Sequence, residues 1–574
     1  MKKILSLVLA LVMLIPCINI NAYADAVTTL DAKYERKMKL VSELLMKDEK
    51  TLKKVEELDR AVVYISVSNG RQQAVTVSSS MKNIDNALDA TFEKARKTDI
   101  SPLWFKLDVV TEVEEISYAD FTGKYKEGVG GSLRQGISFN NYFGRSLLEA
   151  QINSNGILSY ETGELDLKKI NSIFSASGKK LLSSIPETLY LFKAQGYFSD
   201  TVSDAYKLYS GRYAEYGTRK HDIDRYAMVE LAENASKYLA KMCGPDGKFV
   251  YGYYPIDNEE LEGYNIIRHA GTVWNLILQY DMTGDRTLIP AIERALKYLE
   301  KNIHYKDAKT AFLNDRGTLN VGGNGISLLA YVSYAEIMNS RKFDKLIAAL
   351  CNGIMYLQKE DGSFIHTIYK SDYSVHKEYI TVFYDGEATY GLLRAYGLLG
   401  NPKYLTAGEK ACDYFIANNY ETLNSHWIAY SFNEVTKFSP KAEYFSFGLK
   451  NVHGYTDKVN RTVTAAHTTC ETMGATFELY DRLLKSGIEC EMLEEFDGNL
   501  LIEAFEKRVK YGFNYFVQPE QAMYFKNPQL VLNSFVVRED NYRIRIDDIQ
   551  HFMGGYYLYY KNYKTVKSYT ENQQ

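Results

Sequence analysis

The chain has few cysteines for its 574 residues, and their spacing does not pair them. There are six, and five lie beyond the N-terminal segment: Cys243, Cys351, Cys412, Cys470 and Cys490. An odd number without a Cys-x-x-Cys spacing argues against a disulfide framework and against a zinc ribbon. We therefore expect most of these thiols to be small buried residues of the core.

The sequence also lacks a basic tract and a long internal apolar run. Its 68 Lys and Arg residues are balanced by 72 Asp and Glu residues, which gives a net charge of −4. Because non-specific nucleic-acid binding depends on basic residues that neutralise phosphates, this balance argues against a nucleic-acid partner. Beyond the N-terminus no stretch approaches the roughly 18 to 20 apolar residues of a membrane span, so none is predicted.

The N-terminus has the pattern of a secretory signal peptide, which we predict over residues 1–24. Lys2 and Lys3 precede an apolar run, and Ala22-Tyr23-Ala24 has the small-x-small pattern of a cleavage site. Cys17 lacks the small preceding residues of a lipid-modified cysteine, which favours a released protein. The expected location is secreted, extracellular or associated with the cell surface.

Composition and periodicity divide the rest of the chain. We predict an α+β module over residues 25–200, helices of period 3.6 over residues 201–565, and a polar tail over residues 566–574. In the module, extended segments are expected over residues 61–67, 73–79, 104–116 and 136–160. The predicted fold class is mainly α, with a smaller N-terminal α+β module.

Polar motifs open a series of apolar helices in the second region. They are Arg268–Gly271, Val321–Gly325, Asp385–Ala388, His467–Glu471 and Arg545–His551. Short turns and returning helices follow them, which predicts antiparallel hairpins. Residues 369–379 and 430–461 read as inserts before such helices. If the hairpins close into a ring, the polar openings gather at one end, here called the mouth.

Two segments carry a resemblance to a known superfamily. Gln358–Phe364 and Pro245–Phe249 each contain an Asp-Gly turn into a short strand, and the helices around them alternate between inner and outer type. Over residues 200–565 the chain resembles the α/α-toroid superfamily, the six-hairpin barrels of many glycoside hydrolases, polysaccharide lyases, sugar epimerases and terpenoid cyclases. The resemblance implies a ligand cleft at one end of the barrel, and no specific family is identified.

Carboxylates at the helix openings are the candidate catalytic groups. Glycoside hydrolysis needs one protonated and one ionised carboxyl. We assign Glu387 as general acid and Asp547 or Asp548 as the base, with Glu471 in reserve and Asp385 as a further candidate. Capping by acids at helix N-termini explains any one of them equally well, because the helix dipole favours negative charge there.

An alternating run leads into the last opening. Arg543, Arg545 and Asp547 fall on one side of an extended segment, and Asp548 falls near the helix start. One of the two acids is then a partner for an arginine, and the sequence does not decide which.

Cationic and aromatic residues at the same openings are candidates for substrate binding. They are Tyr253, Tyr264, Arg268, His269, His467, Arg545 and His551. Tyrosine is abundant, with 48 residues, and its ring and hydroxyl suit a sugar as well as they suit a large helical core.

Two other chemistries remain open. His467 and Cys470 lie three apart and could join His269 or His551 in a zinc site. In a uronate lyase or epimerase, Arg268 and His269 beside Tyr264 would neutralise a carboxylate and remove a proton. Arg268 could equally pair with Asp385 or Glu387 and lock two hairpins together.

We therefore predict a secreted carbohydrate-active protein whose partner is a polysaccharide or oligosaccharide. The favoured activity is a glycoside hydrolase without cofactor or metal, acting on a bacterial surface or extracellular polysaccharide. The alternatives are a non-catalytic glycan-binding accessory of polysaccharide synthesis or export, and the lyase or epimerase.

Overall fold

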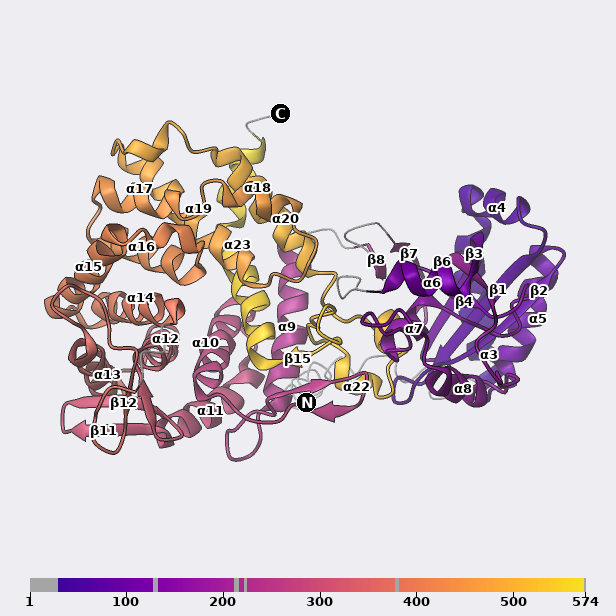
Figure 1. The fold of residues 1–574 in the computed structure, drawn as a ribbon, viewed down its shortest axis with the longest axis horizontal. Coiled ribbons are helices and arrows are strands. Elements are labelled where there is room, and N and C mark those ends of the chain that lie inside the picture. The colour runs from indigo at the N-terminus through magenta and orange to yellow at the C-terminus, as the bar shows by residue number, and fades with distance from the viewer. Residues whose placement is uncertain (1–28, 127–132, 211–215, 221–223, 377–380, 572–574) are drawn as a thin grey trace, which may run out of the picture. The chain divides into compact units, whose positions relative to one another are not determined.

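The chain, in a computed structural model, consists of two compact units (Figure 1). The structure describes residues 29–126, 133–210, 216–220, 224–376 and 381–571. Unit 1 contains Met1–Lys220 and Gln518–Leu532, and unit 2 contains His221–Val517 and Asn533–Gln574. The predicted signal peptide lies outside the described residues. Unit 1 continues past residue 200, where the sequence placed the change, and includes a segment from late in the chain.

Unit 1 is built on an antiparallel sheet of order β2-β1-β3-β6-β4-β5, extended from β6 by β7 and β8. The strands are β1 (Ala61–Ser68), β2 (Val75–Met81), β3 (Trp104–Ser117), β4 (Gly136–Ser138), β5 (Ser146–Leu147), β6 (Thr188–Ser199), β7 (Tyr206–Ser210) and β8 (Tyr216–Arg219). The helices are α3 (Leu30–Met46), α4 (Glu49–Glu56), α5 (Ile84–Arg96), α6 (Tyr118–Tyr125), α7 (Glu149–Ser154), α8 (Leu167–Ala176), α21 (Pro519–Ala522) and α22 (Pro528–Val531).

Side chains alternate between the two faces of the sheet, and the apolar ones on one face form the core of this unit. Val63, Ile65 and Val67 of β1 point to one face, where they pack with Tyr34 of α3 and Phe92 of α5. The α+β character of the module is therefore observed. The expectation of an extended segment over residues 136–160 is wrong, because only β4 and β5 are strands there and α7 follows them.

The late segment Gln518–Leu532 completes unit 1 through buried polar contacts. Glu520 of α21 is fully buried and accepts a hydrogen bond from Arg219 Nη2 at 2.8 Å. The Tyr524 hydroxyl donates to Ser66 of β1 at 2.9 Å, and the Ala74 N–H donates to the Met523 carbonyl at 2.7 Å. A segment distant in sequence is thus an integral part of this sheet unit.

Unit 2 is helical, and its helices form two layers. The inner helices are α10 (Ile266–Thr283), α12 (Val321–Ile337), α14 (Val382–Leu399), α16 (His426–Phe438), α19 (Thr468–Ser486) and α23 (Ile546–Glu571). The outer helices are α9 (Arg225–Met242), α11 (Ile289–Lys301), α13 (Asp344–Leu357), α15 (Pro402–Ala417), α17 (Ala442–Lys450) and α20 (Gly498–Gly512). The short helix α18 (Tyr455–Arg461) precedes α19.

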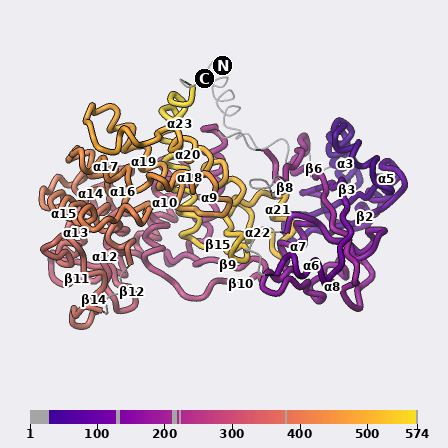
Figure 2. Tube along the Cα trace, turned by 45° about the horizontal axis from the view of Figure 1, so that its top comes forward, coloured from indigo at the N-terminus to yellow at the C-terminus, as the bar shows by residue number. Residues whose placement is uncertain are grey.

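The inner helices close into a ring. Each packs against the next in chain order, and α23 packs against α10 (Figures 1 and 2). Every residue of α12 from Val321 to Ala335 is buried, as expected of a helix that is surrounded on all sides. Unit 2 therefore contains a closed ring of inner helices with a second layer of helices outside it.

Strands connect some of these helices. A small sheet joins β9 (Gly252–Tyr254) to β10 (Glu259–Glu260) and β15 (Ile544–Arg545). A second sheet contains β11 (Ile303–Asp307), β12 (Thr310–Asp315), β13 (Thr318–Asn320) and β14 (Thr367–Tyr369). The pairing of β9 with β15 brings residues before α10 next to residues before α23.

Two further expectations are corrected. The supposed insert over residues 430–461 contains most of α16 and all of α17 and α18, so it supplies an inner helix of the ring. Its residues His426–Thr436 are all buried. Residues 566–571, assigned to the polar tail, continue α23, and Val566 is buried.

The five cysteines that the structure describes are free, and four of them are buried, as the sequence indicated. Among the described residues, no helix is long and apolar enough to cross a membrane.

Candidate active site

The first turns of the inner helices meet at one end of the ring, the mouth. A Cβ added to Gly271 of α10 would lie 2.6 Å from the side chain of Gln550 in α23. One added to Gly386 of α14 would lie 2.6 Å from the Cβ of Trp427 in α16. Neighbouring inner helices therefore run in parallel, and the side chains of their first turns share one region.

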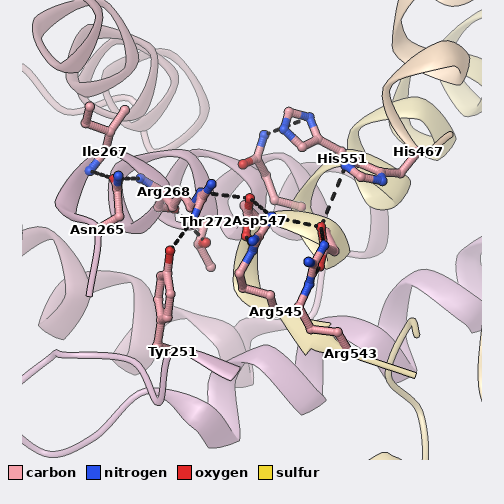
Figure 3. A network of polar contacts seen from close by, with 12 residues as sticks. Tyr251, Asn265, Ile267, Arg268, Thr272, His467, Arg543, Arg545, Asp547 and His551 are labelled. Carbon is pink, nitrogen blue, oxygen red and sulfur yellow. Dashed lines mark hydrogen bonds and ion pairs between the residues drawn. The ribbon is translucent and has the colours of Figure 1, made fainter. Parts of the chain in front are cut away.

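Two aspartates at the start of α23, Asp547 and Asp548, are held by three arginines. Figure 3 shows Asp547 beside these arginines. Arg545 Nη2 donates to Asp547 Oδ2 at 2.9 Å, and Arg268 Nε of α10 lies 3.0 Å from the same oxygen. Arg543 Nε donates to Asp548 Oδ2 at 3.0 Å. Each acid therefore has an arginine from the lead-in strand, which the sequence suggested for one of them, and Asp547 also connects α23 to α10.

The two aspartates differ in their protonation equilibria. Burial alone would raise the pKa of Asp547, but Arg545 and Arg268 outweigh it and hold that pKa below its ordinary value. Burial and the adjacent charge of Asp547 raise the pKa of Asp548 in spite of Arg545. Asp547 is therefore an ionised carboxylate at neutral pH.

Tyr251 is a member of this cluster that the sequence analysis did not select. Arg268 Nη1 donates to its hydroxyl (Figure 3). In the pairing of β9 with β15, Gly252 lies opposite Arg545, which places Tyr251 beside the arginines. Tyr253, the predicted substrate-binding tyrosine, lies opposite Ile544 and is half-buried. The register of this strand pair, which the sequence does not reveal, determines which of the two tyrosines contacts the arginines.

The buried Glu471 of α19 pairs with the half-buried His551 of α23. His551 Nδ1 lies 2.6 Å from Glu471 Oε2, and the Tyr430 hydroxyl of α16 donates to Glu471 Oε1 at 3.0 Å. Gly554 allows this approach, because a Cβ there would lie 2.5 Å from Glu471 Oε1. Burial opposes the charged imidazole, but Glu471 outweighs it and raises the pKa of His551.

Two more imidazoles adjoin His551. His467 lies with its ring centre 5.4 Å from that of His551, and its Nε2 is 3.7 Å from Asp548 Oδ1. The ring of His426 is 5.1 Å away and perpendicular, and its buried Nε2 has no hydrogen-bond partner in the described structure. Burial, and then the charge of His551, lower the pKa of both, for His467 to about 3. His426 lies before the supposed insert over residues 430–461 and was not predicted.

Glu387 in the second turn of α14 has a different environment. Its Oε2 is buried and has no hydrogen-bond partner among the residues described. Gly322 of α12 makes room for it, because a Cβ there would lie 2.2 Å from Oε2. Burial without a neighbouring cation raises the pKa of Glu387 to about 8. Its carboxyl group is therefore mostly protonated at neutral pH.

Asp385, two residues earlier, is fully engaged. His366 Nε2 lies 3.0 Å from its Oδ1, and the Tyr420 hydroxyl donates to its Oδ2 at 3.0 Å. Both oxygens of this buried carboxylate therefore bind side chains outside α14. Its contacts fix the start of the helix, and neither it nor Glu387 is the partner of Arg268.

Tyr264 and His269 lie in the contact between α10 and the outer layer. The Tyr264 hydroxyl bonds His269 Nδ1 at 2.7 Å, and His269 Nε2 bonds the Ala295 carbonyl of α11 at 2.9 Å. His269 is fully buried, and burial lowers its pKa to about 4. The structure does not bring His269 to the arginine cluster, although Arg268 is adjacent in sequence, whereas the Tyr264 ring packs on Tyr251, with ring centres 5.5 Å apart.

The zinc set considered from the sequence is not assembled. Cys470 packs against Gly555 of α23, where a Cβ would lie 2.7 Å from Sγ, and burial raises the pKa of its thiol. His269 lies against α11, as described above. Of that set, only His467 and His551 are neighbours.

Comparisons with known proteins found similar chains among solved structures alone. No family model matches the chain, and no curated protein matches it. Among solved structures, a D-mannose isomerase has a TM-score of 0.47 at 12% identity, covering 61% of this chain and all of the other. An unsaturated glucuronyl hydrolase specific for heparin has a TM-score of 0.43 at 11% identity, covering 59% of this chain and 98% of the other.

A third example is an α-1,6-mannanase from Salegentibacter. Its TM-score is 0.39 at 12% identity, and the match covers 58% of this chain and 98% of the mannanase. At such identities and TM-scores, these matches assign neither a family nor a reaction to the chain.

Proposed function

We propose that unit 2 is a six-hairpin toroid and a secreted glycoside hydrolase. Its substrate is a polysaccharide of a bacterial surface or extracellular matrix. One observation carries the proposal: two buried carboxyl groups at one end of the ring have opposite surroundings, Glu387 with an unpartnered oxygen and Asp547 in contact with Arg268 and Arg545. These surroundings shift their pKa values in opposite directions, to about 8 for Glu387 and below the ordinary value for Asp547. Opposite shifts of this kind separate a general acid from an ionised partner.

Glu387 is the proposed general acid. A carboxyl with a pKa near the working pH keeps its proton until a leaving group needs it. The unpartnered Oε2 leaves this group uncommitted to any described side chain. Burial supplies the shift in pKa, so the acid needs no charged neighbour.

Asp547 is the proposed ionised partner, which positions water or stabilises positive charge at the sugar carbon. Arg268 and Arg545 keep it ionised, and Arg268 is the more exposed of the two guanidinium groups, with 38% of its side chain accessible against 18% for Arg545. Asp548 has a side chain with no exposure and holds Arg543. We therefore assign catalysis to Asp547 and a positioning role to Asp548.

Groups at the mouth can hold a sugar. Arg268 and Tyr251 are partly exposed polar groups beside Asp547, and Phe383, in the first turn of α14, has 48% of its surface exposed. Guanidinium and hydroxyl groups bind sugar hydroxyls, and an aromatic face stacks on a sugar ring. The remaining candidates, Glu471 and Asp385, take no part in the proposed hydrolysis.

The test uses the chain from residue 25 onward, incubated with a panel of bacterial polysaccharides. We expect new reducing ends from the wild type and a loss of activity in both Glu387→Gln and Asp547→Asn. Glu360→Gln, which changes an exposed glutamate, is the matched control and should retain full activity.

The products also separate the alternatives. An unsaturated, ultraviolet-absorbing product indicates a lyase, and tight binding without any product indicates a glycan-binding accessory. Full activity of Glu387→Gln on a cleaved polysaccharide would refute the assignment of the acid.

A further inference from the structure

The mouth contains a second group of side chains that neither the proposed hydrolysis nor its residues require. His426 begins α16, Glu471 lies in the first turn of α19, and His551 lies in the second turn of α23. Within the described residues, one donor atom from each of the three lies within 4.8 Å of the other two. We propose that these side chains bind a divalent transition-metal ion, Zn²⁺.

His426 supplies the observation that points to a ligand. Its Nε2 is buried and has no hydrogen-bond partner among the described side chains. Leaving a buried polar atom unsatisfied costs about 1–3 kcal/mol, which a bound cation would offset. The position is also fixed, because Ser425 before it exchanges two hydrogen bonds with Asn451, at 3.2 and 3.1 Å.

Glu471 is oriented by a neighbour that does not belong to the donor set. Tyr430 donates to Oε1, which leaves Oε2 directed at His551, 2.6 Å from Nδ1. The Tyr430 ring in turn stacks on Tyr390, with ring centres 4.9 Å apart. Partners that orient a ligand in this way are typical of metal sites.

Two imidazoles and one carboxylate are a donor set that suits zinc. Zn²⁺ binds such nitrogen and oxygen atoms at about 2.0–2.2 Å, and catalytic sites keep a fourth position for water or substrate. Tetrahedral ligands at these bond lengths lie about 3.3 Å apart. His551 and Glu471 are closer than this, so metal binding separates them by less than 1 Å and replaces their hydrogen bond.

The charges around the group also favour a cation. Glu471 is buried with a single neighbouring imidazole at hydrogen-bond distance, His551. The arginines of the mouth are engaged by Asp547 and Asp548 instead. His467 adjoins the site, with its ring centre 5.4 Å from that of His551, but it is not one of the three donors.

The test measures metal binding by the chain from residue 25 onward, stripped with a chelator and dialysed against Zn²⁺. We expect one tightly bound ion per chain, a rise in the thermal midpoint on adding Zn²⁺, and the visible spectrum of a tetrahedral site with Co²⁺. His426→Ala and His551→Ala should weaken binding at least tenfold and abolish the thermal shift. Tyr430→Phe should weaken binding by roughly 10- to 100-fold.

Two control variants distinguish a loss of metal binding from a loss of folding and from a loss of hydrolysis. His453→Ala removes an exposed imidazole and should bind like the wild type. Glu387→Gln should keep its full metal content, so the two proposals can fail independently.

Two results would overturn the site. The site is refuted if the wild type, shown to be folded by circular dichroism, binds no more metal than His426→Ala. Proton transfer would then be the remaining role for these imidazoles. If Cys470→Ala alone removes the metal, the ligands are a different set.

Discussion

The starts of α14 and α23 both place buried carboxyl groups at the mouth, but they surround them differently. Glu387 has an unpartnered oxygen, and burial raises its pKa to about 8. Asp547 is just as buried, yet Arg545 and Arg268 lower its pKa. Burial alone therefore does not decide whether a carboxyl at the mouth carries a proton; the presence of a cation does.

The largest effect expected from breaking this contrast is on catalysis. Removing the proton donor with Glu387→Gln should lower kcat/KM by about 10²- to 10⁴-fold, the usual contribution of general acid catalysis. The measurement is release of reducing ends from the polysaccharide identified for the wild type. A decrease below tenfold would mean that another group supplies the proton.

The pH dependence sharpens the same contrast. The pKa of Glu387 rises from an ordinary 4.5 to about 8 in the folded chain. Between these values the native state holds a proton that the unfolded chain has released, so stability must fall as pH rises through this window. Activity should also decline above about pH 8, as the acid ionises.

Urea unfolding midpoints measured across that window check this prediction. Glu387→Gln should remove most of the decrease, because glutamine does not titrate. An equal decrease in the variant would assign the pH dependence to other groups.

Substitution of Asp547, whose carboxylate is bound by two arginines, should have the opposite effect on stability. Asp547→Asn leaves Arg268 and Arg545 without their shared anion, and losing hydrogen bonds to a charged group costs about 1.5–3 kcal/mol. We expect a lower free energy of unfolding for Asp547→Asn at pH 7. Glu387→Gln, which removes no ion pair, should be as stable as the wild type or more stable. The reverse order would refute the assignment of charges.

The smallest expected effect concerns the space that Glu387 occupies. A Cβ in Gly322→Ala would lie 2.2 Å from Glu387 Oε2 and 2.4 Å from the Tyr384 ring, so side chains must shift. Overpacking of this kind costs about 1–3 kcal/mol. Gly123→Ala in α6 meets nothing within 4 Å and should be neutral or stabilising. Similar thermal midpoints for both variants would show that the mouth adapts freely.

The sequence predicted five of the six inner helices and where their polar ends begin, but it did not recognise α16 as an inner helix. Asp385, Glu387, Asp547 and Glu471 all lie in first or second turns of inner helices, because polar residues before an apolar run mark a helix start. What it did not predict is the direction in which each side chain points. Arg268 and His269 are neighbours, but successive residues of a helix are about 100° apart, so one reaches α23 and the other reaches α11.

Features that depend on tertiary packing could not be predicted from the sequence either. Tyr251 rather than Tyr253 contacts Arg268, because the register of β9 against β15 is determined by chain segments almost 300 residues apart. His426 was missed, because most of α16, the helix that it begins, was read as an insert. Unpartnered atoms such as Glu387 Oε2 are visible only after every neighbour has been placed.

The segment Gln518–Leu532 has a consequence for the order in which the protein is made. The ribosome synthesises Met1–Lys220 first, but unit 1 lacks Glu520 and Tyr524 until residue 532 has emerged. Until then, Arg219 has no Glu520 to bind and Ser66 has no tyrosine hydroxyl. The N-terminal unit therefore reaches its final state only after translation has passed through five of the six inner helices, so the first unit begun is among the last to be finished.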